Sequence, residues 1–196
     1  MDRPLTLGTR GSPLALAQAR LVAAALEAAH GWDAGNVRIF PVRTSGDREQ
    51  SQPLADIGGK ALWTKELDLA LLAGETDFSV HSMKDVESER PDALSIAVVL
   101  ERADVRDRLI GAASIEALPR RARIGTSSPR RAAQIRRLRP DLTIAPIRGN
   151  VETRLAKVAA GEFDATLLAA AGLDRLGRGR VGVAIAVEAM LPAPAH

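Results

Sequence analysis

The stretch Gly8-Thr9-Arg10-Gly11-Ser12-Pro13 has a second copy in this chain, Gly125-Thr126-Ser127-Ser128-Pro129. After each proline, a glutamine follows at the fifth position and an arginine at the seventh. Each copy follows a short apolar run and offers a serine N-cap with proline at the first helical position. Later, the segments 73–77 and 160–164 both begin Ala-Gly-Glu and end in aspartate. The sequence therefore predicts two copies of a strand–turn–helix start, each followed by a helix–Gly–strand unit.

Alternating strands and helices of this kind predict mainly parallel sheets flanked by helices. We expect an α/β fold of two similar lobes, like a periplasmic binding protein, with a ligand cleft between them. Lobe 1 is predicted to comprise residues 1–100 plus about 184–196, and lobe 2 residues 101–183. The polar stretch 44–60 is long for a loop and is predicted to be a lid or binding loop.

The individual elements follow from apolar periodicity, caps and glycine stops. The expected strands cover residues 5–9, 37–42, 77–82, 94–99, 123–126, 142–146, 164–168 and 181–187, the last returning to lobe 1. The expected helices cover residues 13–29, 61–73, 129–138, 150–161 and 169–176. The charged stretch 101–107 is expected to be a connector between the lobes.

Composition narrows the class of protein. The chain has 196 residues, 46% of them hydrophobic, which allows a sizeable core. It has no cysteine, which excludes disulfides, thiolate metal ligands and thiol nucleophiles among these residues. The three histidines are scattered, so no metal site is expected. No apolar run approaches the length of a membrane span and no signal-peptide core is present, so we expect a cytoplasmic protein. We also expect a monomer.

Positive charge is concentrated in the middle of the chain. Residues 101–154 carry 13 arginines against 6 acidic side chains, whereas residues 1–100 carry 10 basic and 14 acidic ones. Arginine suits bidentate recognition of carboxylate or phosphate. A solvated basic face and nucleic-acid binding are the alternatives. Aromatic residues make up only 3%, which leaves few platforms for base stacking and argues against nucleic acid.

The basic residues gather at three predicted helix starts, where free N–H groups and the helix dipole favour anions. Arg10 precedes the first helix, Arg130 and Arg131 lie in the first turn of the second, and Arg148 and Arg154 flank the third. This pattern favours a ligand with several carboxylates or phosphates. The alternative is that nearby Asp or Glu side chains neutralise these arginines.

One carboxylate stands at a predicted strand end. Asp85 follows the strand 77–82, beside Lys84 and near His81. In an open α/β sheet, the carboxyl ends of the strands face the ligand crevice. Asp85 is therefore a candidate electrostatic or proton-transfer group. The alternative is an ordinary turn with solvated charges.

Taken together, these motifs resemble the porphobilinogen deaminase (hydroxymethylbilane synthase) family. The resemblance rests on the segments 8–15, 58–60, 80–86, 125–131 and 148–154, and it runs from Leu5 to about Pro194. It implies a transferase of tetrapyrrole (haem) biosynthesis that joins four porphobilinogens head to tail with loss of ammonia.

The resemblance also implies roles for residues. Asp85 matches the catalytic aspartate, which stabilises a cationic azafulvene-like intermediate and binds the pyrrole N–H groups. The positions matching the dipyrromethane cofactor site are Lys84, Thr126, Ser127, Ser128, Arg130 and Arg131. The positions matching the groups that hold substrate acetate and propionate are Arg10, Ser12, Gln18, Arg148, Gly149 and Arg154. Lys60 falls in the family's lid loop.

Two departures from the family pattern matter. The family has a third domain whose cysteine tethers dipyrromethane, and we expect that domain to be absent here. Glu87 stands where the family usually has proline. Without a cysteine, catalysis by the isolated chain is expected to be impaired, or to need a separate chain. A non-catalytic protein that binds pyrrole polycarboxylates in the same cleft is the alternative.

Overall fold

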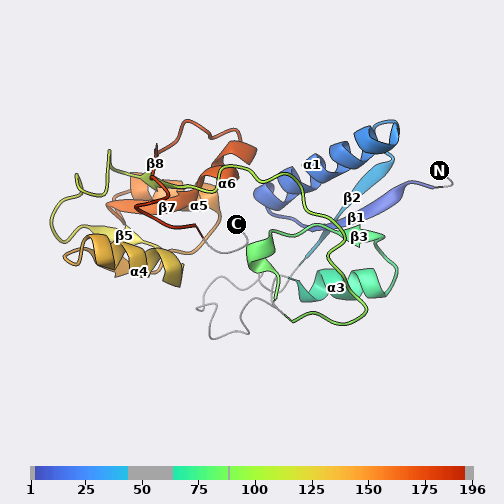
Figure 1. Ribbon diagram of the computed structural model, residues 1–196, viewed down its shortest axis with the longest axis horizontal. Helices are drawn as coiled ribbons and strands as arrows, with labels where there is room; N and C mark the ends of the chain where they lie inside the picture. Colours follow the sequence, from blue (N-terminus) through green and yellow to red (C-terminus); the bar gives the residue numbers. More distant parts are fainter. Residues whose placement is uncertain (1–2, 44–63, 88, 193–196) are drawn as a thin grey trace. The chain divides into compact units, whose positions relative to one another are not determined.

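The computed structural model describes residues 3–43, 64–87 and 89–192 (Figure 1). The chain divides into two compact units, residues 1–101 and residues 102–196. Both are built from strands and helices in alternation, with parallel strand pairing in the first unit and mixed pairing in the second, so the chain has a mixed α/β fold. The predicted lid 44–60, with Lys60, lies outside the described residues.

Unit 1 is a three-stranded parallel sheet with helices on both faces. The strands are β1 (Leu5–Arg10), β2 (Val37–Val42) and β3 (Phe78–Ser79), in the order β2-β1-β3. The helices are α1 (Pro13–His30) and α3 (Lys65–Leu72), which Figure 1 shows on opposite faces of the sheet. A core cluster of Leu7, Ala19, Ala23 and Val37 joins α1 to β1 and β2. The short one-turn helix η3 (Met83–Asp85) follows β3.

Unit 2 is a five-stranded mixed sheet in the order β6-β5-β7-β4-β8. Its strands are β4 (Asp107–Ile110), β5 (Arg123–Gly125), β6 (Thr143–Ala145), β7 (Ala165–Ala169) and β8 (Val183–Ala184). Its helices are α4 (Pro129–Leu138), α5 (Val151–Ala159) and α6 (Ala170–Arg175). β5 pairs in parallel with β6 and β7, whereas β4 is antiparallel to β7 and β8. Leu109, Ile124 and Leu167 lie at the centre of the core, within a larger buried cluster.

The internal repeat predicted from sequence is confirmed in three dimensions. The Ser12 hydroxyl caps α1 by accepting from the N–H of Ala15 at 3.3 Å, and the Ser128 hydroxyl caps α4 by accepting from the N–H of Arg131 at 3.4 Å. Both helices start with proline, whose missing N–H has no cost at that position. Gly74 and Gly161, which follow α3 and α5, have φ values of 72° and 74°, a left-handed conformation that glycine adopts without strain.

The repeat extends to an aspartate that fastens two parallel strands. A carboxylate oxygen of Asp77 accepts from the N–H of Thr6 at 2.7 Å, and one of Asp164 accepts from the N–H of Arg123 at 2.6 Å. In each case the aspartate N–H also donates back to the carbonyl of the same partner residue, at 2.8 and 2.9 Å. Each aspartate therefore sets where its strand begins beside the neighbouring one.

Three expectations about strands were wrong. Residues 94–99 form no strand, and Ile96, Val98 and Val99 are 55%, 71% and 66% exposed. An apolar run becomes a strand only where a neighbouring strand supplies partners for its backbone hydrogen bonds, and no described segment pairs with this one. Conversely, β4 begins inside the stretch expected to be a connector. The strand expected over 77–82 is only Phe78–Ser79, because the chain then turns into η3.

The C-terminal segment also departs from expectation. Residues 181–187 were expected to return to lobe 1, but β8 pairs with β4 of unit 2, with Val183 opposite Leu109. Ile185 and Met190 are 8% and 1% exposed and belong to the unit 2 core, so apolar burial explains why this segment stays there.

The hydrogen bonds between Asp77 and Thr6 lead to a stability prediction. The guanidinium of Arg3 and the N–H of Thr6 lower the pKa of Asp77 to about 2. We expect Asp77→Ala to lower the free energy of unfolding by about 1–3 kcal/mol, since the N–H of Thr6 loses its partner. Because the folded-state pKa is depressed, this contribution is present above about pH 4 and is lost as the pH falls through about 2.

Urea denaturation at pH 7 and pH 2 measures this effect. Asp92→Ala, at an exposed turn aspartate, is the control and should change stability by less than about 0.5 kcal/mol. A loss in Asp77→Ala that is equal at both pH values would contradict the account.

Candidate functional site

Asp85, the predicted catalytic aspartate, lies at the end of η3 just beyond β3, in unit 1. Its N–H donates to the carbonyl of Ser82 at 2.9 Å, which forms the tight turn. The Ser82 hydroxyl donates to Oε1 of Gln18 on α1 at 3.0 Å. Gln18, predicted as a substrate-binding residue, thus fastens the segment that carries Asp85. Lys84 lies beside Asp85 and is exposed.

Charged groups of unit 1 gather around His81. Burial lowers the pKa of His81; Asp68 and Asp85 raise it, and Arg90 and Arg10 lower it, with a net decrease. The electrostatic influence of Arg10 and Asp85 on this one imidazole places both predicted residues in the same neighbourhood. Ser12, also predicted to bind substrate, caps α1 two residues beyond Arg10.

Sequence reasoning missed an ion pair in this neighbourhood. Nη2 of Arg90 donates to Oδ1 of Asp68 on α3 at 2.6 Å, with side-chain exposures of 18% and 12%. The sequence did contain a signal, since Asp68 is the one charged residue within the otherwise apolar run 67–73. A carboxylate on the buried face of a helix requires a partner, because burying a lone charge is costly.

His81 reports on these charges directly. Arg90→Met removes a cation that lowers the pKa of His81, so this pKa should rise toward its ordinary value of 6.5. Asp68→Asn removes a carboxylate that raises it, so the pKa should fall further. Titration of the imidazole signals by NMR measures both, with exposed His30 as the internal reference. Shifts of the same sign in both variants would contradict the arrangement.

In unit 2, the hydroxyl groups predicted to bind the cofactor shape the start of α4. The Thr126 hydroxyl accepts from the N–H of Ser128 at 3.2 Å, and Ser128 caps the helix. The Ser127 hydroxyl donates to the carbonyl of Ile147 at 2.8 Å. The start of α4 is thereby joined to the loop that precedes α5, which carries Arg148 and Gly149.

Arg130 and Arg131, in the first turn of α4, share one acidic partner. Asp107 of β4 is 4% exposed, and its two carboxylate oxygens accept from Nη2 of Arg130 at 2.7 Å and Nη2 of Arg131 at 2.6 Å. Burial by itself raises the pKa of Asp107, but the hydrogen bonds and charges of Arg131 and Arg130 outweigh it and leave the pKa lowered. The sequence left open that nearby Asp or Glu side chains neutralise these arginines. That is partly the case here, because one carboxylate pairs with two guanidinium groups.

A second group of cations surrounds the start of α5. The Asn150 side chain caps this helix by accepting from the N–H of Thr153 at 2.9 Å, and Nε of Arg154 donates to the carbonyl of Gly149 at 3.0 Å. Burial lowers the pKa of Arg154, and the charges of Arg131 and Arg148 lower it further. We call Arg131, Arg148 and Arg154 the guanidinium cluster. The structure brings these three predicted residues together in unit 2.

Glycine is required at Gly149 for two reasons. Its φ of 105° is a conformation that side-chain-bearing residues rarely adopt, and an added Cβ would meet Thr153 at 2.6 Å. The carbonyl that holds Arg154 is therefore presented by a backbone that only glycine fits. Gly149 supports the guanidinium cluster through its main chain.

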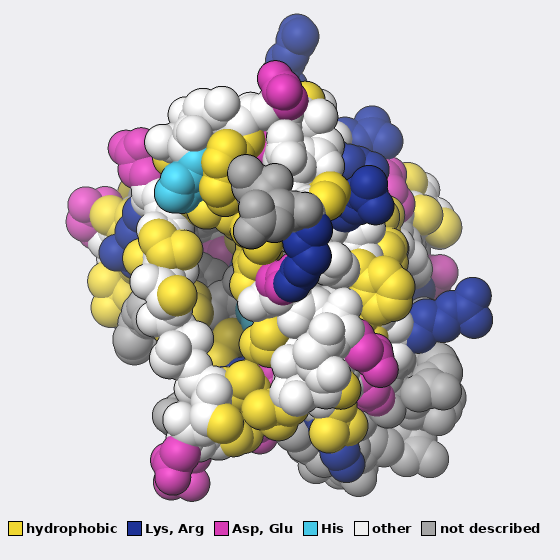
Figure 2. All heavy atoms as spheres, turned by 90° about the vertical axis from the view of Figure 1, so that its right-hand side faces the viewer, with side chains coloured by type: hydrophobic (Ala, Val, Ile, Leu, Met, Phe, Trp, Pro, Cys, Tyr) yellow, Lys and Arg dark blue, Asp and Glu magenta, His cyan; other side chains and the backbone are white. Residues whose placement is uncertain are grey.

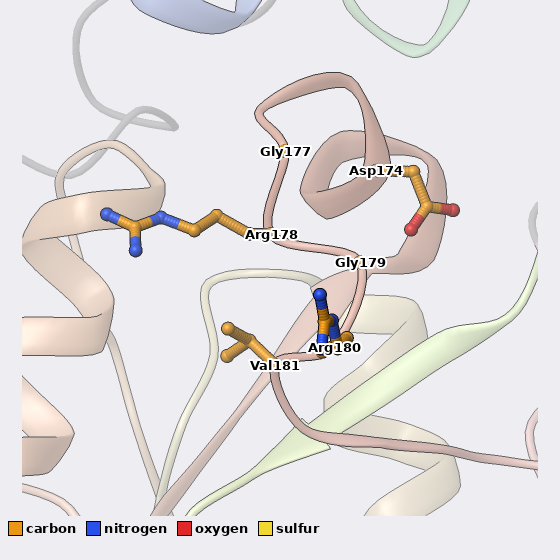
Figure 3. Close-up of a pocket in the computed structure, with 6 residues that line it drawn as sticks. All are labelled: Asp174, Gly177, Arg178, Gly179, Arg180 and Val181. Atoms are coloured by element: carbon orange, nitrogen blue, oxygen red, sulfur yellow. The ribbon is translucent and has the colours of Figure 1, made fainter.

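Other surface features do not add to this site. A shallow hollow after α6 is lined by Asp174 and residues 177–181, and Figure 3 shows the Arg178 side chain directed away from Asp174. Arg178 instead pairs with Glu152 of α5 at 3.1 Å. Figure 2 shows a face on which hydrophobic side chains are interspersed with basic and acidic ones. Among the described residues, Leu69 and Leu72 of α3 are exposed apolar side chains.

Two kinds of feature are missing from residues 3–43, 64–87 and 89–192. No group of three or more His, Asp or Glu side chains there could hold a metal ion. None of the helices described has the length and apolar character needed to cross a bilayer.

The family model described as "Porphobilinogen deaminase, dipyromethane cofactor binding domain" matches residues 5–196. This chain belongs to the porphobilinogen deaminase family. The resemblance inferred from the motifs is therefore confirmed. The matching domain is one that binds dipyrromethane, whereas these 196 residues include no cysteine.

Curated relatives agree with the family assignment. A porphobilinogen deaminase of Sphingopyxis alaskensis is 59% identical over 197 residues, covering 98% of this chain and 62% of the relative. Those of Nitrobacter hamburgensis and Nitrobacter winogradskyi are 56% and 55% identical, over 88% of this chain and 55% of each relative. The chain thus spans somewhat more than half the length of these relatives.

Proposed function

We propose that this chain carries the cofactor-binding and catalytic part of a hydroxymethylbilane synthase, which joins four porphobilinogens and releases ammonia. The observation that carries the proposal is the guanidinium cluster of Arg131, Arg148 and Arg154, in a chain whose family domain binds dipyrromethane. Porphobilinogen bears an acetate and a propionate, and each added pyrrole brings another pair of carboxylates. Clustered guanidinium groups are suited to such a ligand because each can bind a carboxylate through two parallel hydrogen bonds.

The residues of unit 2 fit the charge of dipyrromethane. The buried Nε of Arg131 has no hydrogen-bond partner among the described residues, and a buried N–H without a partner favours an incoming acceptor. When bound, dipyrromethane supplies the pyrrole carbon to which the chain of substrates is added. Arg131, Arg148 and Arg154 would hold its carboxylates, and Lys84, Thr126, Ser127, Ser128 and Arg130 are proposed as the remaining cofactor-binding residues. The chain's own residues offer no thiol for the covalent link.

Asp85 is proposed as the catalytic residue. Its carboxylate would accept hydrogen bonds from pyrrole N–H groups and offset the positive charge that develops as the substrate loses ammonia. Gln18 would hold the Ser82–Asp85 turn in place, and Arg10 and Ser12 would orient substrate carboxylates. A fixed carboxylate stabilises such a cation better than water does, because it needs no reorganisation during the reaction.

The proposal includes the arrangement expected from sequence. The proposed site residues come from both units: Asp85 and Arg10 belong to unit 1, and the guanidinium cluster belongs to unit 2. Residues 44–60, with Lys60, would act as the lid. The protein is proposed to act as a cytoplasmic monomer on a small polycarboxylate, without nucleic acid or membrane.

A second candidate is a protein that binds pyrrole polycarboxylates without turnover. The absence of cysteine from these 196 residues favours it for the isolated chain, since no covalent primer can form there. Both candidates use the same cations, so binding does not separate them. Turnover does.

Incubation with porphobilinogen tests the proposal, with ammonia release and tetrapyrrole absorbance as the readouts. We expect the 196-residue chain alone to show impaired turnover, and to be rescued by the complementary C-terminal part of the Sphingopyxis alaskensis relative. Asp85→Asn should abolish the rescued turnover while leaving porphobilinogen binding within about threefold. Thermal stabilisation by porphobilinogen with no turnover under either condition would favour the binding protein.

The guanidinium cluster has its own test. We expect Arg154→Met to weaken porphobilinogen binding by at least about tenfold, because a charge-assisted pair contributes about 1.5–3 kcal/mol. Isothermal titration calorimetry measures this affinity. Arg137→Met, at an exposed arginine in the last turn of α4, removes the same charge elsewhere and should change it less than twofold. Equal losses of affinity in both variants would show that binding depends only on the total positive charge of the chain.

A further inference from the structure

We propose that Asp107 is a positioning residue, which fixes two arginines at the start of α4 so that one of them faces the ligand. The inference rests on the proposed function, because it assigns Asp107 a role in the polycarboxylate site. Asp107 was not among the residues singled out from the sequence, where it lay in a stretch expected to be a connector.

The geometry begins with the position of the carboxylate. Asp107 opens β4, where its backbone is held on both sides: it lies opposite Ala169 of β7, and its carbonyl accepts from the N–H of Ile185 at 2.9 Å. Its side chain is 4% exposed and points both oxygens at α4, toward Arg130 and Arg131 at 2.7 and 2.6 Å. A carboxylate with a fixed backbone and two partners has little freedom to move.

The two arginines are each held at a second point. Nη1 of Arg131 donates to the carbonyl of Leu167 on β7 at 3.1 Å, and Nη1 of Arg130 donates to the carbonyl of Leu191. Gln134 strengthens the contact with Leu191, since its side chain exchanges two hydrogen bonds with that residue's backbone, at 3.0 and 2.7 Å. Both guanidinium planes are therefore fixed by the protein before any ligand arrives.

The two arginines differ in what remains available. Arg131 is 12% exposed at its side chain, acts electrostatically on Arg154, and has a buried Nε without a partner among the described residues. Arg130 also uses both Nη groups, on Asp107 and Leu191, as Arg131 does on Asp107 and Leu167, but its Nε is not among the buried side-chain atoms left without a partner. Arg131 is therefore the member of the pair that presents a donor to the polycarboxylate, and Arg130 secures the C-terminal segment and completes the coordination of Asp107.

Asp107 also offsets electrostatic repulsion at the start of α4. Two adjacent cations in the first turn of a helix oppose the positive end of the helix dipole. The charge of Arg154 lies close enough to Arg131 to add to this repulsion. A buried carboxylate between Arg130 and Arg131 allows them to stay together at the helix start without consuming the remaining Arg131 donor.

Removing the charge of Asp107 distinguishes a positioning role from simple electrostatics, because the two predict opposite changes in the affinity for porphobilinogen. Asp107→Asn makes the site one unit more positive, so charge alone would tighten the binding of an anion. Loss of orientation instead predicts that porphobilinogen binds about tenfold more weakly. Asp141→Asn is the matched control: Asp141 makes a similar bidentate pair with Arg139 at 2.7 and 2.8 Å, away from the cluster.

The experiment titrates porphobilinogen into the full 196-residue chain and its Asp107→Asn, Asp107→Glu and Asp141→Asn variants by calorimetry. NMR of the guanidinium groups in the unaltered chain gives a second readout. Arg131 should show separate Nη signals, which mark slow rotation, and these should merge as the pH falls and Asp107 is protonated. Partial recovery of affinity in Asp107→Glu relative to Asp107→Asn would support the role of the carboxylate.

The outcomes separate the inference from the function on which it rests. If the unaltered chain does not bind porphobilinogen, the proposed function is wrong. If the unaltered chain binds it and Asp107→Asn binds equally well or more tightly, the positioning role is wrong and the function stands. If Asp107→Asn does not fold, the NMR readout decides: rapidly rotating Arg131 Nη groups in the unaltered chain would overturn the inference.

Discussion

The interaction on which the rest of unit 2 depends is the contact of one buried carboxylate with two guanidinium groups. Asp107 lies on the central sheet and Arg130 and Arg131 on the helix that packs against it. Like charges cannot be gathered in a partly buried place unless a counter-charge is built in or supplied by a ligand. In unit 2, Asp107 compensates the cations of α4, whereas the described residues that act on the pKa of Arg154 include no acidic group.

In unit 1, the positive and negative groups that act on one side chain are equal in number. Two carboxylates, Asp68 and Asp85, and two arginines, Arg10 and Arg90, act on the half-buried imidazole of His81. The Asp68–Arg90 pair satisfies itself within the unit. Asp85 lies on a one-turn helix fastened to α1 through Ser82 and Gln18. The chain thus carries a positioned carboxylate in one unit and a cluster of positioned cations in the other.

Both arrangements are built on the same local design. A capped helix starts after a parallel strand in each unit, and an aspartate ties the repeat's last strand to its first. The corresponding glutamines have diverged: Gln18 holds a side chain near Asp85, whereas Gln134 holds the backbone of Leu191. The same scaffold therefore supports different contacts at equivalent positions, because the scaffold depends on backbone geometry and the contacts depend on what packs beside it.

The sequence by itself determined the local elements and the family. Ser12–Pro13, Ser128–Pro129, Gly74 and Gly161 set helix ends through caps and backbone conformation, which are properties of neighbouring residues. The residues predicted at helix starts, Arg131, Arg148 and Arg154, do gather in unit 2. Only the tertiary structure decided which apolar runs become strands and which charges meet, since both depend on partners distant in the chain. Residues 94–99 looked like a strand but have no partner among the described residues, whereas Asp107 looked like part of a charged linker and became the buried counter-ion of α4.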